Sequence, residues 1–421
     1  MRKLYLISQV QMSKTGAGNI SHGRNPDIKS GFISSFIASV LALQYIILAL
    51  FQYRSVRIAR EVLRSLLKLK NDFLGDKGYS RMIYRGGKFY FNMHVPGFPS
   101  KLLLKQQLGE LNRIRPVRSP SNRLRIVFLS ITNKCPLQCR HCYEWENLNK
   151  PDILGVEDYK AIISKFTDKG VGQFHFGGGE PMLNYPVLLE LTKFLKGKSE
   201  AWIATSGPGL SYEKARELRR SGLTGAAISV DHFDAAKHND FRGSDKSFMW
   251  AMDATENSVR AGLVTCWSIC LSREFVSSEN LYRYASLAGS LGVHFIQVFE
   301  PFPVGRFKGH DILLPQDQLD IVEDFYINYN ASRNQKGMPL MTYHGYYLRR
   351  LGCLGGGNRY LYIDASGFAQ ACPFCRNESH INLLELSADQ VFQMLAREEC
   401  IFDSDLHKER LVGNPIGEVL F

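Results

Sequence analysis

Acidic side chains are scarce in the first 125 residues, and the rest of the chain lacks a surplus of basic ones. Residues 1–125 contain 22 Lys and Arg against 5 Asp and Glu, whereas residues 126–421 contain 30 against 35. A basic nucleic-acid-binding protein usually spreads Lys and Arg over its main folded surface, so there is no clear nucleic-acid signal. The uneven charge favours a basic N-terminal region that lies against an anionic membrane surface.

The chain also lacks the cysteine pattern of a disulfide scaffold. Its nine Cys are an odd number, and 421 residues can build a hydrophobic core without disulfides. Three of these Cys lie within eight residues, which indicates a metal centre instead. An iron–sulfur centre would require a reducing compartment, so we expect the catalytic part in the cytoplasm.

A secretory signal peptide is not indicated, because the first long apolar segment starts late and leads into basic residues. Residues 1–31 are polar and predicted to be mobile, whereas residues 32–51 form an uncharged stretch of 20, long enough to cross a bilayer core of roughly 30 Å. Three basic residues lie in the twenty before it and six in the twenty after. We expect a membrane anchor with the catalytic domain cytoplasmic. A buried or amphipathic helix of a cytoplasmic protein is the alternative.

Beyond residue 123, short segments rich in β-branched residues alternate with segments of helical periodicity. Six β/α units in series predict an α/β fold with a parallel sheet, either curled into an open barrel or doubly wound. In both cases the loops after the strand C-termini build the active site. The predicted strands are 124–131, 171–176, 201–205, 225–230, 264–271 and 293–299, and the predicted helices are 155–169, 185–197, 211–221, 247–262 and 278–291.

Three cysteines, Cys135, Cys139 and Cys142, directly follow the first predicted strand in the sequence CPLQCRHC. Three thiolates can hold three irons of a cubane cluster while the fourth iron stays open for a small ligand. The alternative is zinc, but a structural zinc site needs a fourth ligand nearby, and so tight a loop can hardly supply both Cys142 and the adjacent His141. We therefore expect an iron–sulfur cluster with one open iron.

This CxxxCxxC loop, followed by Tyr143, resembles the signature of the radical S-adenosylmethionine (SAM) superfamily. One β/α unit later the chain reads Gly178-Gly179-Glu180-Pro181, which is similar to the GGEP motif of that family. Glycine lets a backbone approach a ligand closely, and a carboxylate at this strand end can receive an ammonium group. The resemblance implies that Glu180 and the backbone of residues 178–181 hold the amino group of SAM.

Later strand ends carry further motifs of the same family. The sequence Thr205-Ser206-Gly207 is similar to its TNG motif, with Ser in place of Asn, and a PxGR-like turn ends at Arg306. Ser229 and Arg242 lie in a stretch that resembles its SxD…HxxxRG pattern. The resemblance implies a partial (β/α)6 TIM-type barrel with a [4Fe–4S] cluster and SAM as cofactors, and SAM-binding residues Tyr143, Gly178, Gly179, Glu180, Pro181, Ser206, Ser229 and Arg242.

A second cysteine group lies near the C-terminus. Cys353, Gly367, Cys372 and Cys375 fit the C-x(9–15)-G-x4-C opening of the family's SPASM and twitch extensions, and the intervening segment predicts a hairpin with Gly367 in its turn. The resemblance implies one auxiliary [4Fe–4S] cluster on the three cysteines, with Cys400 as fourth ligand. The remaining cysteines are too few for a full SPASM domain, so the extension is twitch-like. A closed zinc site on the same four cysteines is the alternative.

The expected organisation is an N-terminal hydrophobic helix, an α/β barrel and a small C-terminal cysteine-rich α+β extension. The expected boundaries are 1–31 for a polar segment, 32–51 for the transmembrane helix, 52–122 for a basic juxtamembrane region, 123–310 for the radical SAM core, 311–351 for a connecting helical segment, 352–400 for the twitch/SPASM-like domain and 401–421 for a tail.

The resemblance implies an enzyme that reductively cleaves SAM to a 5′-deoxyadenosyl radical, which abstracts hydrogen from a substrate. Enzymes with a SPASM or twitch extension often modify peptides or proteins, so we expect a peptide or protein substrate and an electron donor of the flavodoxin or ferredoxin type. The apolar segment favours two alternatives: radical modification of a lipid-linked or membrane-associated small molecule, and a membrane-anchored, non-catalytic iron–sulfur electron carrier. The sequence assigns no catalytic acid or base.

Overall fold

The computed structural model describes most of the chain between residues 25 and 395. Three of the four cysteines expected at the second metal centre, Cys353, Cys375 and Cys400, lie outside the described residues, as do the segments 1–24 and 401–421. The described residues are 25, 27–74, 81–117, 124–332, 335, 337–351, 359–374 and 381–395.

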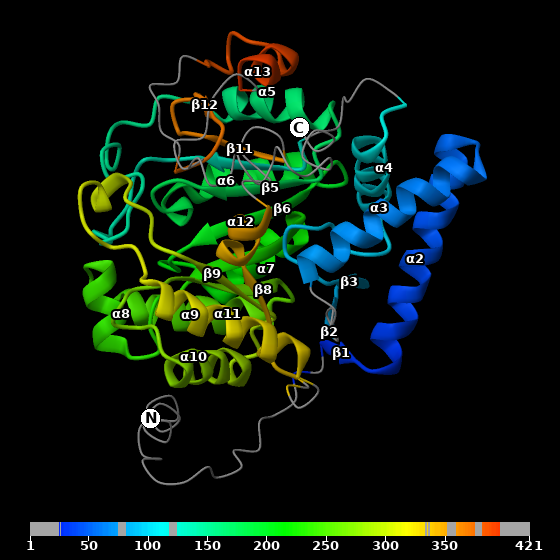
Figure 1. Cartoon of the computed structure of the whole chain (residues 1–421). Helices are drawn as coiled ribbons and strands as arrows, with labels where there is room; N and C mark the ends of the chain where they lie inside the picture. The colour runs from blue at the N-terminus through cyan, green and yellow to red at the C-terminus, as the bar shows by residue number, and fades with distance from the viewer. Residues whose placement is uncertain are drawn as a thin grey trace.

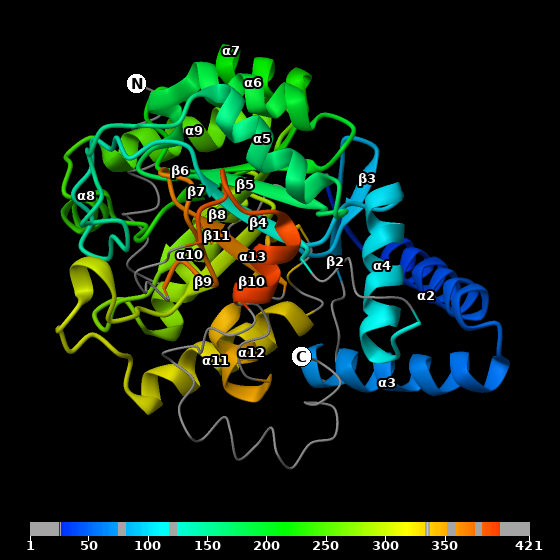
Figure 2. The same cartoon turned by 90° about the horizontal axis from the view of Figure 1, so that it is seen from above.

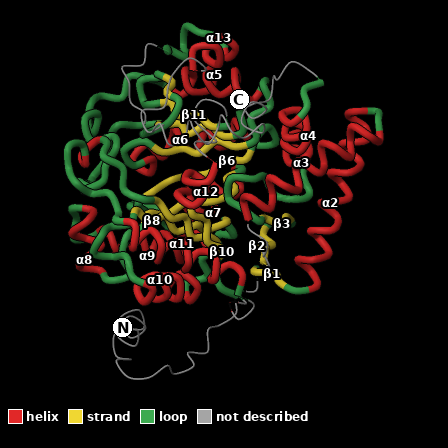
Figure 3. Tube along the Cα trace, viewed as in Figure 1, coloured by secondary structure: helices red, strands yellow, loops and turns green. Residues whose placement is uncertain are grey.

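A nine-stranded sheet forms the centre of the molecule (Figures 1 and 3). Its strands follow the order β10-β9-β8-β7-β6-β5-β4-β11-β12, and every neighbouring pair is parallel except β11 and β12. All six predicted strands are present and lie side by side in chain order, which confirms the α/β fold. They are β4 (Ile126–Ser130), β5 (Gln173–Gly177), β6 (Glu200–Thr205), β7 (Leu223–Ser229), β8 (Val264–Cys270) and β9 (Phe295–Phe299).

Helices cover the outer face of the sheet, and Figure 2 shows α5, α6, α7 and α9 together on one side of the strands. Phe174 and Phe176 of β5 are completely buried in the core between sheet and helices. His175 alternates with them and therefore faces the interior of the curled sheet. The helices are α5 (Val156–Thr167), α6 (Tyr185–Leu195), α7 (Tyr212–Ser221), α9 (Ser247–Arg260) and α10 (Ser278–Ser290), as predicted, and α8 (Ala235–Arg242), which the sequence did not predict.

The sheet continues beyond the six predicted units at both edges. The segment 311–351, expected to be helical, contains α11 (Gln316–Ala331), the strand β10 (Leu340–Tyr343) and α12 (His344–Leu351). On the other edge, β11 (Tyr360–Ile363) pairs with β4, and β12 (Ala369–Gln370) pairs with β11 as the predicted hairpin. Gly367 lies in that turn with φ +86, and α13 (Ala388–Leu395) follows. The C-terminal hairpin is thus part of the barrel sheet.

A small antiparallel sheet closes the end of the barrel where the parallel strands begin. It consists of β1 (Ile28–Ser30), β2 (Arg81–Arg85) and β3 (Lys88–Tyr90), so a strand lies in the segment 1–31 that was expected to be mobile. Ile28 and Ile83 are buried against Phe295 of β9, and the side chain of Asn25 donates to the carbonyl of Gly292 at 3.0 Å. These contacts attach the N-terminal segment to the barrel.

Three further helices pack on one another beside the barrel (Figure 1). They are α2 (Phe32–Tyr53), α3 (Val56–Leu74) and α4 (Lys101–Ile114). Halfway along α2, the side chain of Gln44 donates to that of Gln107 on α4 at 2.5 Å, and the hydroxyl of Tyr53 donates to the carbonyl of Leu111 at 2.5 Å. One side of α2 therefore contacts protein over most of its length.

The other side of α2 is apolar and exposed. Within the described part of the chain, α2 is the one helix that is long and apolar enough to cross a membrane. Its large side chains that face solvent are Phe32, Ile33, Phe36, Leu43, Ile46, Ile47, Leu50 and Phe51.

Candidate active site

The loop that carries Cys135, Cys139 and Cys142 follows β4 at the end where the parallel strands finish. Cys139 is buried and the other two cysteines are half-buried. All three line one cavity of about 610 Å³ in the barrel interior. The structure thus brings the predicted cysteines together at the predicted face of the sheet.

The glycine-rich turn after β5 supports the first part of this loop. The backbone N–H of Gly179 donates to the carbonyl of Thr132 at 2.8 Å, and that of Glu180 donates to the carbonyl of Lys134 at 2.8 Å. A Cβ atom on Gly178 or Gly179 would overlap these same two carbonyl oxygens, and Gly178 also has φ +128. The glycines are therefore required by the approach of the cysteine loop, a reason that the sequence alone did not reveal.

The end of α8 supports the middle of the loop. The N–H of Gln138 donates to the carbonyl of Arg242 at 3.1 Å, and the N–H of Arg140 donates to that of Phe241 at 2.9 Å. The ring of His141 stacks on that of Phe241, with centroids 4.9 Å apart. The predicted motif around Arg242 therefore also fixes the backbone of the cysteine loop.

The turn after β9 supports the last part of the loop. The N–H of Arg306 donates to the carbonyl of Cys142 at 3.0 Å, and its guanidinium donates to the carbonyl of Gln138 and lies 4.2 Å from the ring centroid of Trp145. Gly305 has φ +55, and a Cβ there would overlap the Cys142 carbonyl. The PxGR-like turn thus holds the backbone of the cysteine loop by hydrogen bonds.

Glu180 is a buried carboxylate near the C-terminal ends of β5 and β6. Its two oxygens accept from the Thr205 hydroxyl at 2.5 Å, the Ser206 N–H at 2.8 Å and the Met182 N–H at 3.1 Å. Burial raises the pKa of Glu180 to about 7, although these donors and the charge of Arg242 oppose the shift. A cationic ligand group in the cavity would favour its ionised form.

Arg242 is a buried cation at the other side of the cavity. Its Nε donates to Oδ2 of Asp231 at 2.5 Å, and its NH1 lies 3.7 Å from the sulfur of Cys139 and 3.4 Å from the hydroxyl of Ser206. Burial disfavours the charged form, but Asp231 and Cys139 together raise the pKa of Arg242. The cavity therefore contains a permanent positive charge beside the thiols.

Asp231, for which the motifs predict no site role, is the residue that orients Arg242. It is 5% exposed and also accepts the N–H of Cys270 at 3.0 Å. Burial opposes ionisation, yet the charges of Arg242, His141 and His238 lower the pKa of Asp231 overall. Its place two residues after Ser229, in the SxD pattern, was the available signal.

The three thiols are neutral in the protein without metal. Burial raises the pKa of Cys135 and Cys142 to about 12 and also raises that of Cys139, where Arg242 opposes the shift. Within the described ranges, no three His, Cys, Asp or Glu side chains are close enough to bind a single metal ion. The spacing of the three thiols suits a cubane, which holds its thiolates further apart than a single ion does.

The remaining predicted cofactor residues line or border the same cavity. Ser206 and Ser229 lie at the ends of β6 and β7, Pro181 starts a buried 3₁₀ turn (Pro181–Asn184), and Tyr143 follows the cysteine loop. The ring of Tyr143 makes edge contacts with Tyr362 of β11 at 5.9 Å between centroids. The C-terminal hairpin thereby contacts the cysteine loop.

Cys372 also faces this cavity, directly after the C-terminal hairpin. Its thiol is buried, and its sulfur accepts the N–H of Phe374 at 3.4 Å and the hydroxyl of Tyr360 at 3.8 Å. One member of the second predicted cysteine group therefore lines the same cavity as the first group. Its other three cysteines lie outside the described residues.

Sequence reasoning missed a group of histidines deeper in the cavity. The ring centroid of His94 lies 5.6 Å from that of His175 and 5.3 Å from that of His344. Nε2 of Gln297 is 2.8 Å from Nε2 of His344. Burial lowers the pKa of His175 to about 3 and that of His344 to about 4, so both are neutral at pH 7. Nε2 of His175 is buried and has no hydrogen-bond partner among the described residues.

Comparison with known proteins agrees with this geometry. Residues 129–273, from β4 to just after β8, match the Radical SAM superfamily. The AdoMet-dependent heme synthase of Oleidesulfovibrio alaskensis is 24% identical over 307 residues, which cover 67% of this chain and 78% of that protein. The PqqA peptide cyclase of Streptomyces rochei is 29% identical over 254 residues, 59% of this chain and 68% of the cyclase.

A solved structure shares the fold. The crystal structure of Streptococcus suis SuiB bound to its precursor peptide SuiA aligns with a TM-score of 0.57 at 13% identity, covering 78% of this chain and 82% of SuiB. The chain therefore carries a radical SAM domain. It is a radical SAM enzyme, for which the superfamily implies a [4Fe–4S] cluster and SAM, and this confirms the class that the cysteine and GGEP motifs predicted.

Proposed function

We propose that Cys135, Cys139 and Cys142 hold the [4Fe–4S] cluster and that SAM lies between Glu180 and Arg242. Three thiols on one supported loop, with a carboxylate and a guanidinium facing the same cavity, support this assignment. Glu180 would accept the ammonium group of SAM, and Arg242 would pair with its carboxylate. Together these cofactors supply a carbon-centred radical that removes hydrogen from the substrate.

The residues around the cavity would bind and orient SAM and exclude water. Glu180 is held by Thr205 and Ser206, and Arg242 is held by Asp231, so neither charge reorganises when a ligand enters. Tyr143, which follows the cysteine loop, contacts Tyr362 of the C-terminal hairpin, and both line the cavity. An external one-electron donor of the flavodoxin or ferredoxin type completes this proposal.

The proposed substrate is a peptide or protein. The observation that carries this proposal is the similarity to a peptide cyclase in sequence and, in fold, to SuiB, whose structure contains a bound precursor peptide. The cavity of about 610 Å³ is large enough for an amino-acid side chain beside SAM. The neutral imidazoles of His175 and His344 would contact that side chain.

The peptide proposal can be tested with a short open reading frame next to the gene. The encoded peptide is incubated with the reconstituted enzyme, SAM and a reductant, and its mass is measured beside the amount of 5′-deoxyadenosine. A change in peptide mass that requires SAM and the intact Cys139 supports the proposal. Deoxyadenosine formation without any change in this peptide, together with lipid or isoprenoid enzymes encoded nearby, would favour the membrane-associated small molecule instead.

The proposed auxiliary centre includes Cys372, with Cys353, Cys375 and Cys400. The support from the described residues is the buried Cys372 thiol at the opening of the cavity. Metal analysis distinguishes the two candidates after anaerobic reconstitution. Iron and sulfide for two [4Fe–4S] clusters per chain support an auxiliary cluster. Iron for one cluster together with one zinc per chain would identify the second centre as a zinc site.

We propose that α2 attaches the enzyme to an anionic membrane by its exposed side without crossing it. A crossing α2 would take the charged helix α4 into the bilayer, because Gln44 and Tyr53 are bonded to α4. The exposed apolar side of α2 and the basic residues of α3 suit a helix that lies in the interface. The catalytic domain would then face the cytoplasm.

Vesicle flotation tests this attachment. The double variant Leu43→Ser/Ile47→Ser removes two exposed apolar side chains and should weaken binding to anionic vesicles roughly tenfold or more. The matched control is Ile153→Ser/Leu313→Ser, two comparably exposed side chains on the barrel. Equal binding of both variants would contradict the proposal, as would protease protection of residues before α2 inside sealed vesicles, which requires a crossing helix.

A further inference from the structure

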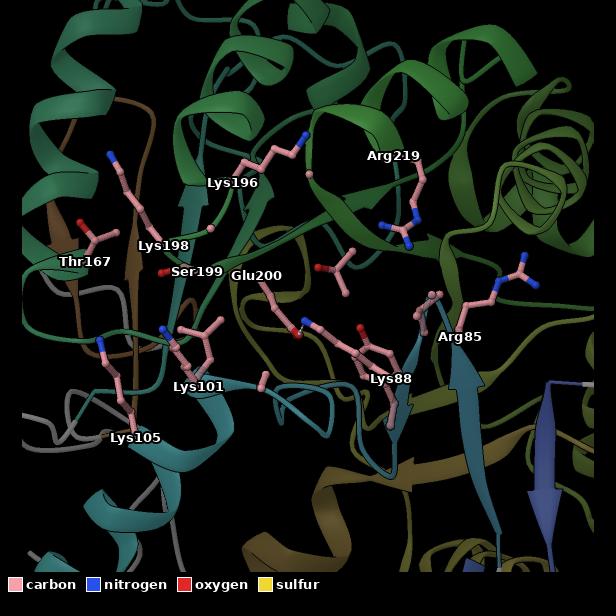
Figure 4. A pocket seen from close by; sticks show the side chains of 18 of the residues that line it. Arg85, Lys88, Lys101, Lys105, Thr167, Lys196, Lys198, Ser199, Glu200 and Arg219 are labelled. Carbon is pink, nitrogen blue, oxygen red and sulfur yellow. Dashed lines mark hydrogen bonds and ion pairs between the residues drawn. The ribbon is translucent and has the colours of Figure 1, made fainter. Parts of the chain in front are cut away.

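A second pocket lies at the opposite end of the barrel from the cysteine loop. It has a volume of about 640 Å³ and is lined by the starts of β6, β7 and β8, the turn between β2 and β3, and the first turn of α4. Parallel strands begin here and end at the cysteine loop, so the two cavities are on different faces. Figure 4 shows side chains from these separate elements around one opening.

Basic side chains dominate the lining. Only Asp168 and Glu200 are acidic, and Glu200 is already satisfied by Lys88 Nζ at 3.2 Å, the Gly97 N–H at 3.1 Å and the Gln173 side chain at 3.1 Å. The basic residues of the lining are Arg85, Lys88, Lys101, Lys105, Lys196, Lys198 and Arg219.

Two of these cations have their charge compensated within the protein. Arg85 pairs with Asp27, and Lys88 pairs with Glu200. The other five, from α4, the segment before β6 and α7, form no ion pair with a described residue. Nζ of Lys196 donates to the carbonyl of Arg220 at 2.9 Å, and Nζ of Lys198 lies 3.5 Å from the ring centroid of Phe194, but neither contact supplies a negative charge. The lining thus combines these five cations with one further acid, Asp168, in a concave site, where low-dielectric walls strengthen the attraction of anions.

The arrangement of two groups directs this charge into the pocket. Nε of Arg219 donates to the carbonyl of Gly262 at 3.1 Å, and Figure 4 shows the guanidinium pointing toward the Lys88–Glu200 pair. A Cβ on Gly86 would overlap this guanidinium, so the turn between β2 and β3 leaves it room. Lys101 starts α4, and the residues of this first turn, 100–102, line the same opening.

We propose that this pocket binds a ligand with several oxyanion groups, which are either phosphate groups or closely spaced carboxylates. Its volume lies within the range of small-ligand sites, roughly 300–1,000 Å³. Five flexible or partly fixed cations from three segments suit several negative groups better than one. This site is independent of the cysteine loop and of the proposed radical chemistry.

The test measures binding of two probes to the full-length reconstituted enzyme by calorimetry: tripolyphosphate and a hexaglutamate peptide. The variant Lys101→Ala/Lys105→Ala removes two exposed cations of the pocket lining. The control, Lys68→Ala/Lys70→Ala, removes the same charge from exposed positions on α3, outside the pocket.

The proposal requires that at least one probe binds and that the pocket variant weakens its affinity by about tenfold while the control changes it less than twofold. Preference for tripolyphosphate identifies phosphate groups as the ligand chemistry, and preference for hexaglutamate identifies carboxylates. The proposal is overturned if neither probe binds, or if both double variants weaken binding equally, since binding would then follow net charge alone.

Discussion

Nε of Arg242 donates to Oδ2 of Asp231 at 2.5 Å, and both side chains are more than nine-tenths buried beside the cysteine loop. The pair leaves NH1 of Arg242 directed at Cys139 and Ser206. Asp231 is thus a positioning residue, since it acts on the cavity only through Arg242. An unpaired buried guanidinium would be free to reorient or to draw in water.

Changing Asp231 to Asn should weaken SAM binding roughly tenfold or more while leaving the iron content unchanged, because the cysteines are untouched. SAM affinity is measured by equilibrium dialysis of the reconstituted protein, and iron by colorimetric assay. The control is Asp311→Asn, which breaks an exposed pair with Arg273. Unaltered SAM affinity in Asp231→Asn would show that the pair does not position Arg242 for SAM.

Changing Gly178 to Ala should destabilise the fold by roughly 3 kcal/mol or more, because the new Cβ overlaps the Thr132 carbonyl and φ is +128. Gly197→Ala is the matched control. Its φ is +82, but its Cβ would meet no atom within 4 Å, so the expected loss is about 1 kcal/mol. Urea unfolding measures both. Equal losses would mean that the close approach of the cysteine loop is not what requires glycine.

The buried His175 should make the fold sensitive to acid. Burial lowers its pKa from 6.5 to about 3, so the unfolded chain binds a proton at higher pH than the folded one. The contribution of neutral His175 to the free energy of unfolding is complete above pH 6.5 and is lost as the pH falls toward 3. The loss between pH 7 and 4.5 is about 3 kcal/mol.

The variant His175→Phe keeps a ring stacked on Trp202 but removes this titration, so its stability should fall less steeply below pH 6.5. Exposed His310, changed to Phe, is the control and should keep the wild-type slope. Urea midpoints between pH 7 and 4.5 give the slopes. A parallel acid loss in all three proteins would rule out His175 as a cause.

Much of the barrel could be predicted because its strands and helices alternate with clear periods. β4 to β9 and the helices between them follow the sequence pattern closely. β10 was less accessible, because a four-residue strand between helices has too few positions to show alternation. The hairpin of β11 and β12 was predicted, but the pairing of β11 with β4 was not, because it joins residues far apart in sequence. Residues 28–30 look polar in sequence, yet pairing with β2 and burial of Ile28 make them a strand.

The site was easiest to predict where a residue type in a spaced motif has few roles other than the predicted one. Cys139 and Glu180 occur in spaced motifs, and both line the cavity at the ends of the parallel strands. Gly178 was assigned to a SAM-binding motif and Arg306 to a turn typical of the family, but their contacts with the cysteine loop depend on residues far apart in sequence. His175 and Gln173 alternate with Phe174 and Phe176, which is a signal for an inward polar face.

The apolar segment shows the limit of length and composition. Residues 32–51 satisfy both criteria for a crossing helix, but neither criterion contains the contact between Gln44 and Gln107. That contact joins α2 to a helix sixty residues later, and only the folded chain reveals it. The same holds for the basic pocket, whose lysines come from three separate segments.

We propose above that Cys135, Cys139 and Cys142 hold a cluster that cleaves SAM. The most direct measurement is the yield of 5′-deoxyadenosine from the anaerobically reconstituted, reduced full-length enzyme with SAM. We predict deoxyadenosine from the wild type and none from Cys139→Ala, whose auxiliary metal remains in place. A wild-type protein that is fully loaded with iron and sulfide, binds SAM and yet forms no deoxyadenosine would contradict the account.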